Sequence, residues 1–77
     1  MKKAYTKNPT IRRMCWMAEK LRERYKEASS VDIDCFAYDE FNGVAPAYRI
    51  YVANHLHNLS FRTWRECQKK FYELIEV

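Results

Sequence analysis

The stretch from Val31 to Asn54 constrains the fold most, because no other part of the chain alternates as a β-strand does. Apolar side chains stand at the odd positions from 31 to 37, while the even positions mix acids with aromatics. Successive side chains of a strand point to opposite faces, so this pattern predicts a strand with one buried face. A second such run extends from Tyr48 to Ala53. Together the two runs predict an antiparallel hairpin.

The segment between the two runs sets the expected register of the hairpin. A two-residue turn at Asn42-Gly43 places Cys35 opposite Ile50. In that register Pro46 falls at a hydrogen-bonded pair, where it has no N–H to donate. We therefore expect regular pairing to stop before the turn, with residues 39–46 forming a longer or bulged loop.

Helical spacing flanks the hairpin on both sides. Asn8 is the expected N-cap of the first helix, and Pro9 takes its first position. Its apolar stripe recurs at steps of three and four and comprises Ile11, Met14, Ala18, Leu21, Tyr25 and Ala28. After a connector over residues 54–58, Ser60 is the expected N-cap of the second helix. The buried side of that helix comprises Phe61, Trp64, Cys67, Phe71, Leu74 and Ile75.

These elements predict an α+β fold in the order α-β-β-α, a small antiparallel hairpin sheet with two amphipathic helices packed on one face. With 77 residues the chain is expected to form a single domain over residues 1–77, of which 1–7 are a loosely ordered basic amino terminus. The sequence shows neither an apolar run of membrane-spanning length nor a secretory leader, which predicts a cytoplasmic protein without a membrane partner.

The three cysteines agree with that compartment, because Cys15, Cys35 and Cys67 are odd in number and widely spaced. Each stands at a position that faces or borders the predicted core, so we expect buried thiols. A zinc site normally uses close ligand pairs, which this chain lacks.

The first candidate surface is the outer face of the hairpin, formed by Phe36, Tyr38, Arg49 and Tyr51. In the expected register Phe36 lies across from Arg49, a geometry that suits a cation–π contact. If both helices cover the inner face, these rings face solvent. The outer face would then expose more apolar surface than a small monomer normally does. A partner would then cover them, either another copy or a different protein. The alternative is that one helix or the amino-terminal segment covers this face.

The second candidate surface is the first helix, where residues 1–30 carry nine Lys and Arg against three Glu, a local net charge of +6. Trp16 falls on the polar side of this helix. Tryptophan and arginine are common contact residues both for protein partners and for nucleic acid, so this side could bind either. The nucleic-acid interpretation uses Arg12, Arg13, Trp16, Lys20 and Arg24. Because the glutamates interleave at helical spacing, intrahelical ion pairs explain part of the pattern without a ligand.

Catalytic chemistry has little support. His55 and His57 could form a metal site with Asp32 and Asp34, but no spacing fixes these groups around one point, and polar loop histidines are the favoured interpretation. The single glycine leaves little scope for a serine elbow or a phosphate-binding loop. We therefore expect no catalytic residues, no metal, no cofactor and no small-molecule substrate.

The sequence thus favours a non-enzymatic intracellular interaction module, of inhibitor or adaptor type, that binds a protein partner or itself as a homodimer. Phe36, Tyr38, Arg49 and Tyr51 would form the contact, with Trp16 as a second anchor. The alternative is a nucleic-acid-binding accessory protein that uses the basic side of the first helix. In size and style the chain is similar to accessory proteins of phages and mobile elements, a similarity of type that carries no residues across.

Overall fold

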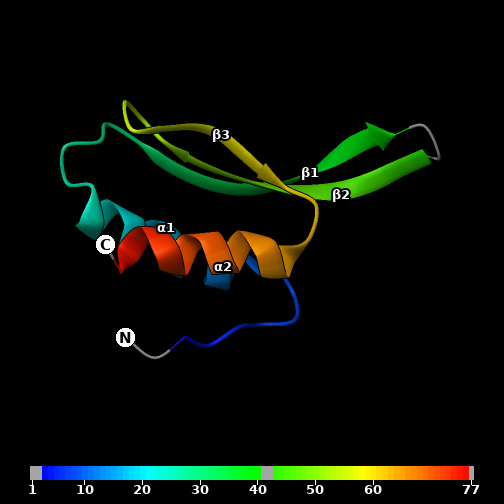
Figure 1. Cartoon of the computed structure of the whole chain (residues 1–77), viewed down its shortest axis with the longest axis horizontal. Helices are drawn as coiled ribbons and strands as arrows, with labels where there is room; N and C mark the ends of the chain where they lie inside the picture. Colours follow the sequence, from blue (N-terminus) through cyan, green and yellow to red (C-terminus); the bar gives the residue numbers. More distant parts are fainter. Residues whose placement is uncertain (1–2, 41–42, 77) are drawn as a thin grey trace.

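The computed structural model describes residues 3–40 and 43–76, without the side chains of Tyr38, Glu40, Leu56, His57 and Asn58. Its elements are α1 (Ile11–Arg24), β1 (Val31–Glu40), β2 (Gly43–Val52), β3 (Leu56–Phe61) and α2 (Trp64–Ile75). Figure 1 shows both helices on one face of an antiparallel sheet of order β1-β2-β3. The predicted α+β class, the hairpin and the placement of the helices are confirmed, and a third strand makes the order α-β-β-β-α.

The hairpin pairs over its full length, with Ile33 opposite Ile50 and Glu40 opposite Gly43. The predicted loop over residues 39–46 is therefore wrong, and the register differs by two residues from the predicted one. A shift of two residues keeps every side chain on its predicted face, because the side-chain period of a strand is two.

Pro46 explains why this register is the stable one. The N–H of Ala53 donates to the carbonyl of Ser30 at 3.0 Å, so the odd positions of β2 form the hydrogen-bonded pairs with β1. Pro46 stands at an even position, opposite Ala37, where no N–H has to be donated to β1.

The third strand replaces the connector expected over residues 54–58. Leu59 lies opposite Ile50 of β2, and its side chain is partly buried against the core. The reversal between β2 and β3 is closed by the N–H of His55, which donates to the carbonyl of Val52 at 3.0 Å. Asn54 takes a positive φ of 66° in this turn, a conformation that asparagine tolerates better than most residues.

Both helices begin later than the sequence predicts. Thr10, not Asn8, caps α1, because its hydroxyl accepts the N–H of Arg13 at 3.1 Å. Thr63, not Ser60, caps α2, because its hydroxyl accepts the N–H of Glu66 at 3.1 Å and donates to the Glu66 carboxylate at 2.9 Å. The expected N-caps were therefore wrong by two and three residues.

The core lies between the helices and the inner face of the sheet. Its fully buried apolar side chains are Met17, Leu21, Ile50, Val52, Cys67 and Phe71. Helix α1 contacts α2 as well as the sheet, since the rings of Trp16 and Phe71 lie 5.5 Å apart. This second contact widens the buried arc of α1 beyond the predicted stripe, so Met17 is buried together with Leu21, while Ile11, the first residue of the helix, is 74% exposed.

Two of the three cysteines are exposed, which corrects the prediction of buried thiols. Cys35 points to the inner face of the sheet, but it lies in the part of the hairpin that the helices do not cover, so its side chain is exposed. Cys15 is also exposed. Only Cys67, within α2, is buried, and burial raises the pKa of its thiol to about 12.

The amino-terminal segment from Lys3 to Asn8, here called the strap, lies along the helices on the side away from the sheet (Figure 1). Its backbone hydrogen-bonds to α2, because the N–H of Ala4 donates to the Tyr72 hydroxyl at 3.0 Å and the N–H of Thr6 donates to Gln68 Oε1 at 2.9 Å. Lys3 lies 3.4 Å from the Glu76 carboxylate. From Lys3 onward these contacts replace the loosely ordered terminus that the sequence suggests.

Candidate functional site

The outer face of the sheet is the side that points away from both helices. Its described side chains come from even positions of β1, odd positions of β2 and one position of β3, namely Asp32, Asp34, Phe36, Ala45, Ala47, Arg49, Tyr51 and Ser60. Within residues 3–40 and 43–76, no helix and no part of the strap covers this face (Figure 1). The alternative that a helix or the amino-terminal segment shields it is therefore wrong.

Arg49 lies at the centre of the outer face. It donates from Nη2 to Asp34 Oδ2 at 2.6 Å and from Nε to Asp34 Oδ1 at 3.2 Å, and its guanidinium carbon lies 5.9 Å from the centroid of the Phe36 ring. The hydrogen bond with Asp34 raises the pKa of Arg49, so the charge is fixed. Because both partners are about two-fifths exposed, solvent screens this ion pair and it contributes little to stability.

The sequence prediction placed Phe36 directly across from Arg49, and the two-residue shift corrects this pairing. Asp34 is the residue opposite Arg49, whereas Phe36 lies opposite Ala47 and contacts the guanidinium diagonally. Phe36 is 37% exposed, and Tyr51 is partly buried on the same face. The structure thus brings Phe36, Arg49 and Tyr51 onto one surface, while the side chain of Tyr38 lies outside the described residues.

A small hollow of about 240 Å³ adjoins Phe36. Besides Phe36 it is lined by Ala47, Ser60, Phe61 and Arg62. Its volume lies below the roughly 300–1,000 Å³ of typical small-molecule sites, and a mainly apolar hollow beside an aromatic ring suits an anchoring side chain of a protein partner. Sequence reasoning missed the residues from β3, because the strand itself was not predicted.

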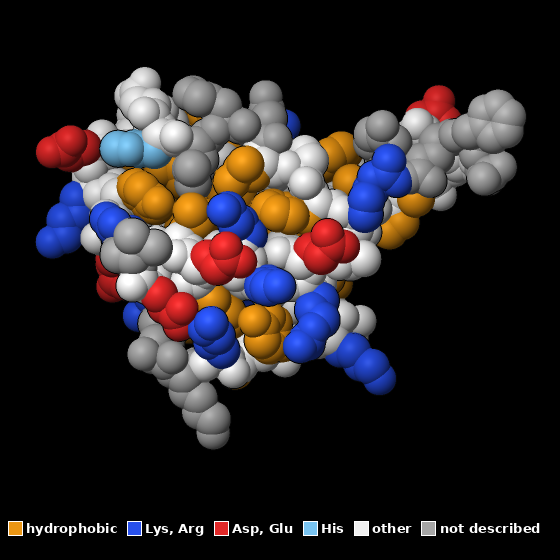
Figure 2. All heavy atoms as spheres, in the orientation of Figure 1, with side chains coloured by type: hydrophobic (Ala, Val, Ile, Leu, Met, Phe, Trp, Pro, Cys, Tyr) orange, Lys and Arg blue, Asp and Glu red, His pale blue; other side chains and the backbone are white. Residues whose placement is uncertain are grey.

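The paired ends of β1 and β2 extend beyond the helices as an arm, defined here as residues 35–40 and 43–46 (Figure 1). Figure 2 shows hydrophobic side chains along this arm, and Val44 is 71% exposed there. A second shallow apolar hollow is lined by Cys35, Phe36, Ala37, Val44, Ala45 and Pro46. A two-stranded ribbon without a layer packed against it is marginally stable in water. Contact with a partner would bury the apolar side chains of the arm and stabilise it.

The basic side of α1 is largely occupied by intramolecular contacts. The guanidinium carbon of Arg13 lies 4.5 Å from the Trp16 ring centroid, and Arg13 donates to the carbonyl of Ala4 at 2.5 Å. Lys20 pairs with Glu23 at 3.5 Å, and Arg24 lies over Tyr25 at 5.2 Å. Trp16 is half-buried against Phe71 instead of standing in solvent. Of the five residues of the nucleic-acid interpretation, only Arg12 is exposed and makes no such contact with the described residues.

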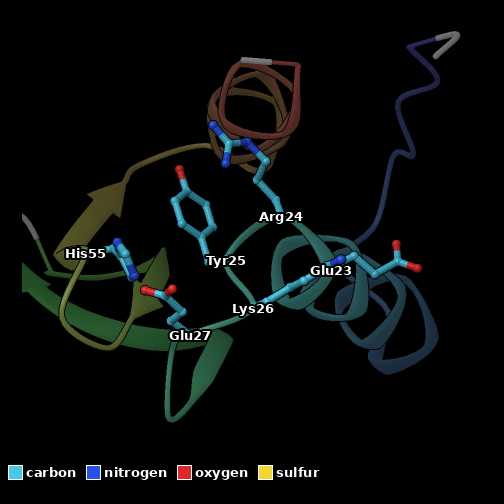
Figure 3. A pocket seen from close by; sticks show the side chains of 6 residues that line it. All are labelled: Glu23, Arg24, Tyr25, Lys26, Glu27 and His55. Carbon is cyan, nitrogen blue, oxygen red and sulfur yellow. The ribbon is translucent and has the colours of Figure 1, made fainter.

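A polar hollow of about 400 Å³ lies at the carboxyl end of α1 and is lined by Glu23, Arg24, Tyr25, Lys26, Glu27 and His55. Figure 3 shows Tyr25 beside His55, whereas Glu23 points away from both. The ring centroids of Tyr25 and His55 are 5.1 Å apart. Among the described residues no three His, Cys, Asp or Glu side chains could hold a metal ion, and the His57 side chain lies outside them.

Comparison with protein families, with curated proteins and with solved structures found no match to this chain. No helix in the described part of the chain is long and apolar enough to cross a membrane. Inferences about function must therefore come from the surface itself.

Proposed function

We propose that this chain is a non-enzymatic interaction module that binds a protein partner through the outer face of its sheet. The observation that carries the proposal is the asymmetry of the sheet: helices cover one face, while Phe36, Arg49 and Tyr51 stand together on a face that no described element covers. Aromatic residues and arginine are enriched at the centres of protein interfaces. An inhibitor or an adaptor would act in this way, because neither has to carry out a reaction.

The charges around this face indicate which kind of partner fits it. Asp32 is exposed on this face, Asp39 is exposed on the opposite face of the arm, and the arm contains no Lys or Arg. Acidic groups around an apolar centre favour a protein surface with an apolar centre and a basic rim, because complementary charges speed association and exclude wrong partners. The same acids repel the phosphates of a nucleic acid.

The proposal is tested by placing a photo-crosslinking amino acid at position 36 or 51 of the full chain, in the cells that naturally produce it. We expect both positions to crosslink to one and the same protein, which mass spectrometry identifies. The matched control is position 11, because Ile11 is even more exposed than Phe36 but lies at the start of α1.

The purified partner then permits a quantitative test. Phe36→Thr should weaken its binding about tenfold or more, since an aromatic anchor commonly contributes more than 1.4 kcal/mol, and Ile11→Thr should leave binding unchanged. Equal crosslinking at positions 11 and 36, or full binding by Phe36→Thr, would contradict the proposal. Crosslinks only between two copies of the chain would make the outer face a homodimer interface instead.

A further inference from the structure

The strap is held by polar side chains that recognise its backbone. Gln68 uses both ends of its amide on one residue, since Oε1 accepts the N–H of Thr6 at 2.9 Å and Nε2 donates to the Thr6 carbonyl at 3.0 Å. Tyr72 does the same two residues earlier, where its hydroxyl accepts the N–H of Ala4 at 3.0 Å and donates to the Ala4 carbonyl at 2.7 Å. Residues two apart in an extended chain present these groups to the same side. The pattern therefore recognises an extended segment.

Side-chain contacts add selectivity to this recognition. The indole Nε1 of Trp64 donates to the Thr6 hydroxyl at 3.0 Å. The Tyr5 ring packs edge-on against Tyr72 with centroids 5.5 Å apart, and the guanidinium carbon of Arg65 lies 4.5 Å from the Tyr5 centroid. The segment that fits therefore carries an aromatic residue followed by threonine.

These polar groups need an occupant. Gln68 is fully buried and Tyr72 is 1% exposed. Apart from a 3.4 Å contact between Gln68 and the Trp64 carbonyl, the hydrogen bonds of both side chains with the described residues all go to the strap or to Arg13. A buried donor or acceptor left without a partner costs about 1–3 kcal/mol. Whenever the strap leaves, another extended segment of the same chemistry gains the same bonds.

The connection between the strap and α1 is a short hinge. The N–H of Thr10 donates to the carbonyl of Asn8 at 3.0 Å across Pro9, which reverses the chain within three residues. A residue before proline favours the extended conformation, so opening this turn is inexpensive. Short hinges favour the exchange of an element between two copies.

We infer that Arg13, Trp64, Gln68 and Tyr72 form a binding site for an extended segment in trans, and that its occupant is the strap of a second copy of this chain. Each copy places residues 3–8 against α2 of the other, in a reciprocal two-fold pair. The bonds are the same within one chain and between two chains. The exchange therefore becomes favourable at protein concentrations that approach the effective concentration of the tethered strap, on the order of 1 mM. The inference is independent of the outer face of the sheet.

The test is complementation between two full-length variants. Thr6→Pro removes the N–H that Gln68 accepts and damages the strap, while its own binding site stays intact. Gln68→Leu damages the binding site, while its strap stays intact. Neither variant alone can form the full contact between strap and site. In a mixture, however, the strap of the Gln68→Leu variant can bind in the site of the Thr6→Pro variant. One variant is labelled with ¹⁵N, and the two are refolded together and weighed by native mass spectrometry.

We expect mixed-mass dimers to form at about tenfold lower concentration than the wild-type dimer, because the mixed pair gains a contact that neither monomer has, whereas the wild type only exchanges one contact for another. A synthetic peptide of residues 3–9 should suppress the mixed dimer. If Gln68→Leu fails to fold, Tyr72→Phe replaces it, because it removes only the hydroxyl that binds Ala4.

Absence of mixed dimers from folded variants would overturn the inference. It would also be overturned by a wild-type dimer that survives both substitutions. Phe36→Thr in both chains is the control for the outer face and should leave the mixed dimer unchanged. If Phe36→Thr abolishes the dimer, copies pair through the sheet instead.

Discussion

Neighbouring residues on β2 illustrate how differently the two faces of the sheet are used. Ile50 is fully buried under the helices, whereas Tyr51, the next residue, points to the outer face and is only partly buried. The same backbone positions both side chains, yet one contributes to the core and the other to a surface. Stability and recognition are therefore assigned to alternate residues of one strand, so substitutions should be able to separate them.

The largest effect is expected on the inner face. Ile50→Ala removes a fully buried side chain between helices and sheet, and we expect it to lower the free energy of unfolding by about 2–5 kcal/mol. Urea unfolding followed by circular dichroism measures this loss. A loss below about 1 kcal/mol would show that the two faces are less different than their burial implies.

The second effect extends the comparison to α2, where Gln68 is buried against the strap and Lys69 is exposed. Gln68→Ala should cost about 2–3 kcal/mol, because it leaves the backbone groups of Thr6 without their partners. Lys69→Ala is the matched control and should change stability by about 0.5 kcal/mol or less. Hydrogen exchange should show faster exchange of the Thr6 amide in the first variant only.

The third prediction concerns pH and the buried thiol. Burial raises the pKa of Cys67 to about 12 from an ordinary value of 9.0, so the folded protein keeps the thiol protonated after the unfolded chain has begun to lose this proton. This contribution to stability is complete below about pH 9 and is lost as the pH rises toward 12, at about 1.4 kcal/mol per pH unit. Burial also raises the pKa of Tyr48, which acts in the same direction.

Denaturant unfolding at pH values between 7 and about 11 tests this prediction. Cys67→Ala should remove one proton, about 1.4 kcal/mol per pH unit, from the slope of the unfolding free energy against pH. At pH 8 a thiol reagent should modify the exposed Cys15 and Cys35 quickly and Cys67 only on unfolding. An equal rate at all three thiols would contradict the burial of Cys67.

The smallest effect on stability is expected on the outer face. Phe36→Thr removes a ring that is 37% exposed and contacts Arg49, so it should cost about 1 kcal/mol or less. Thermal unfolding measures this difference. A cost as large as that of Ile50→Ala would remove the distinction between the two faces, because Phe36 would then act as a core residue.

The sequence predicts which face each strand residue occupies, because a period of two survives any shift by an even number of residues. It could not decide between two registers that differ by two residues, since both satisfy the apolar pattern, and the position of Pro46 selects one of them only when the hydrogen-bond parity is known. The third strand was missed because His57 and Asn58 interrupt its apolar alternation.

The strap lay beyond sequence reasoning for a different reason. The spacing of Gln68 from Trp64 and Phe71 places it on the apolar side of α2, but its polar side chain gives no sign of burial, and its two bonds to Thr6 account for that burial. The N-cap of α2, in contrast, has a sequence signature, Thr63 followed three residues later by Glu66, although the prediction placed this cap at Ser60. Of the outer face, the sequence identified Phe36, Arg49 and Tyr51, but not the hollow that β3 completes.

Pro46 also affects how the protein can aggregate at high concentration. Beyond Tyr48, which pairs with Phe61, the outer edge of β2 has no neighbour among the described strands, and an unpaired edge can template fibrous aggregates. The pyrrolidine ring stands on that edge and offers no N–H there, so an incoming strand cannot continue its ladder past this point. On this edge of β2 the hairpin thus resists pairing with an incoming strand, while its apolar side chains stay accessible.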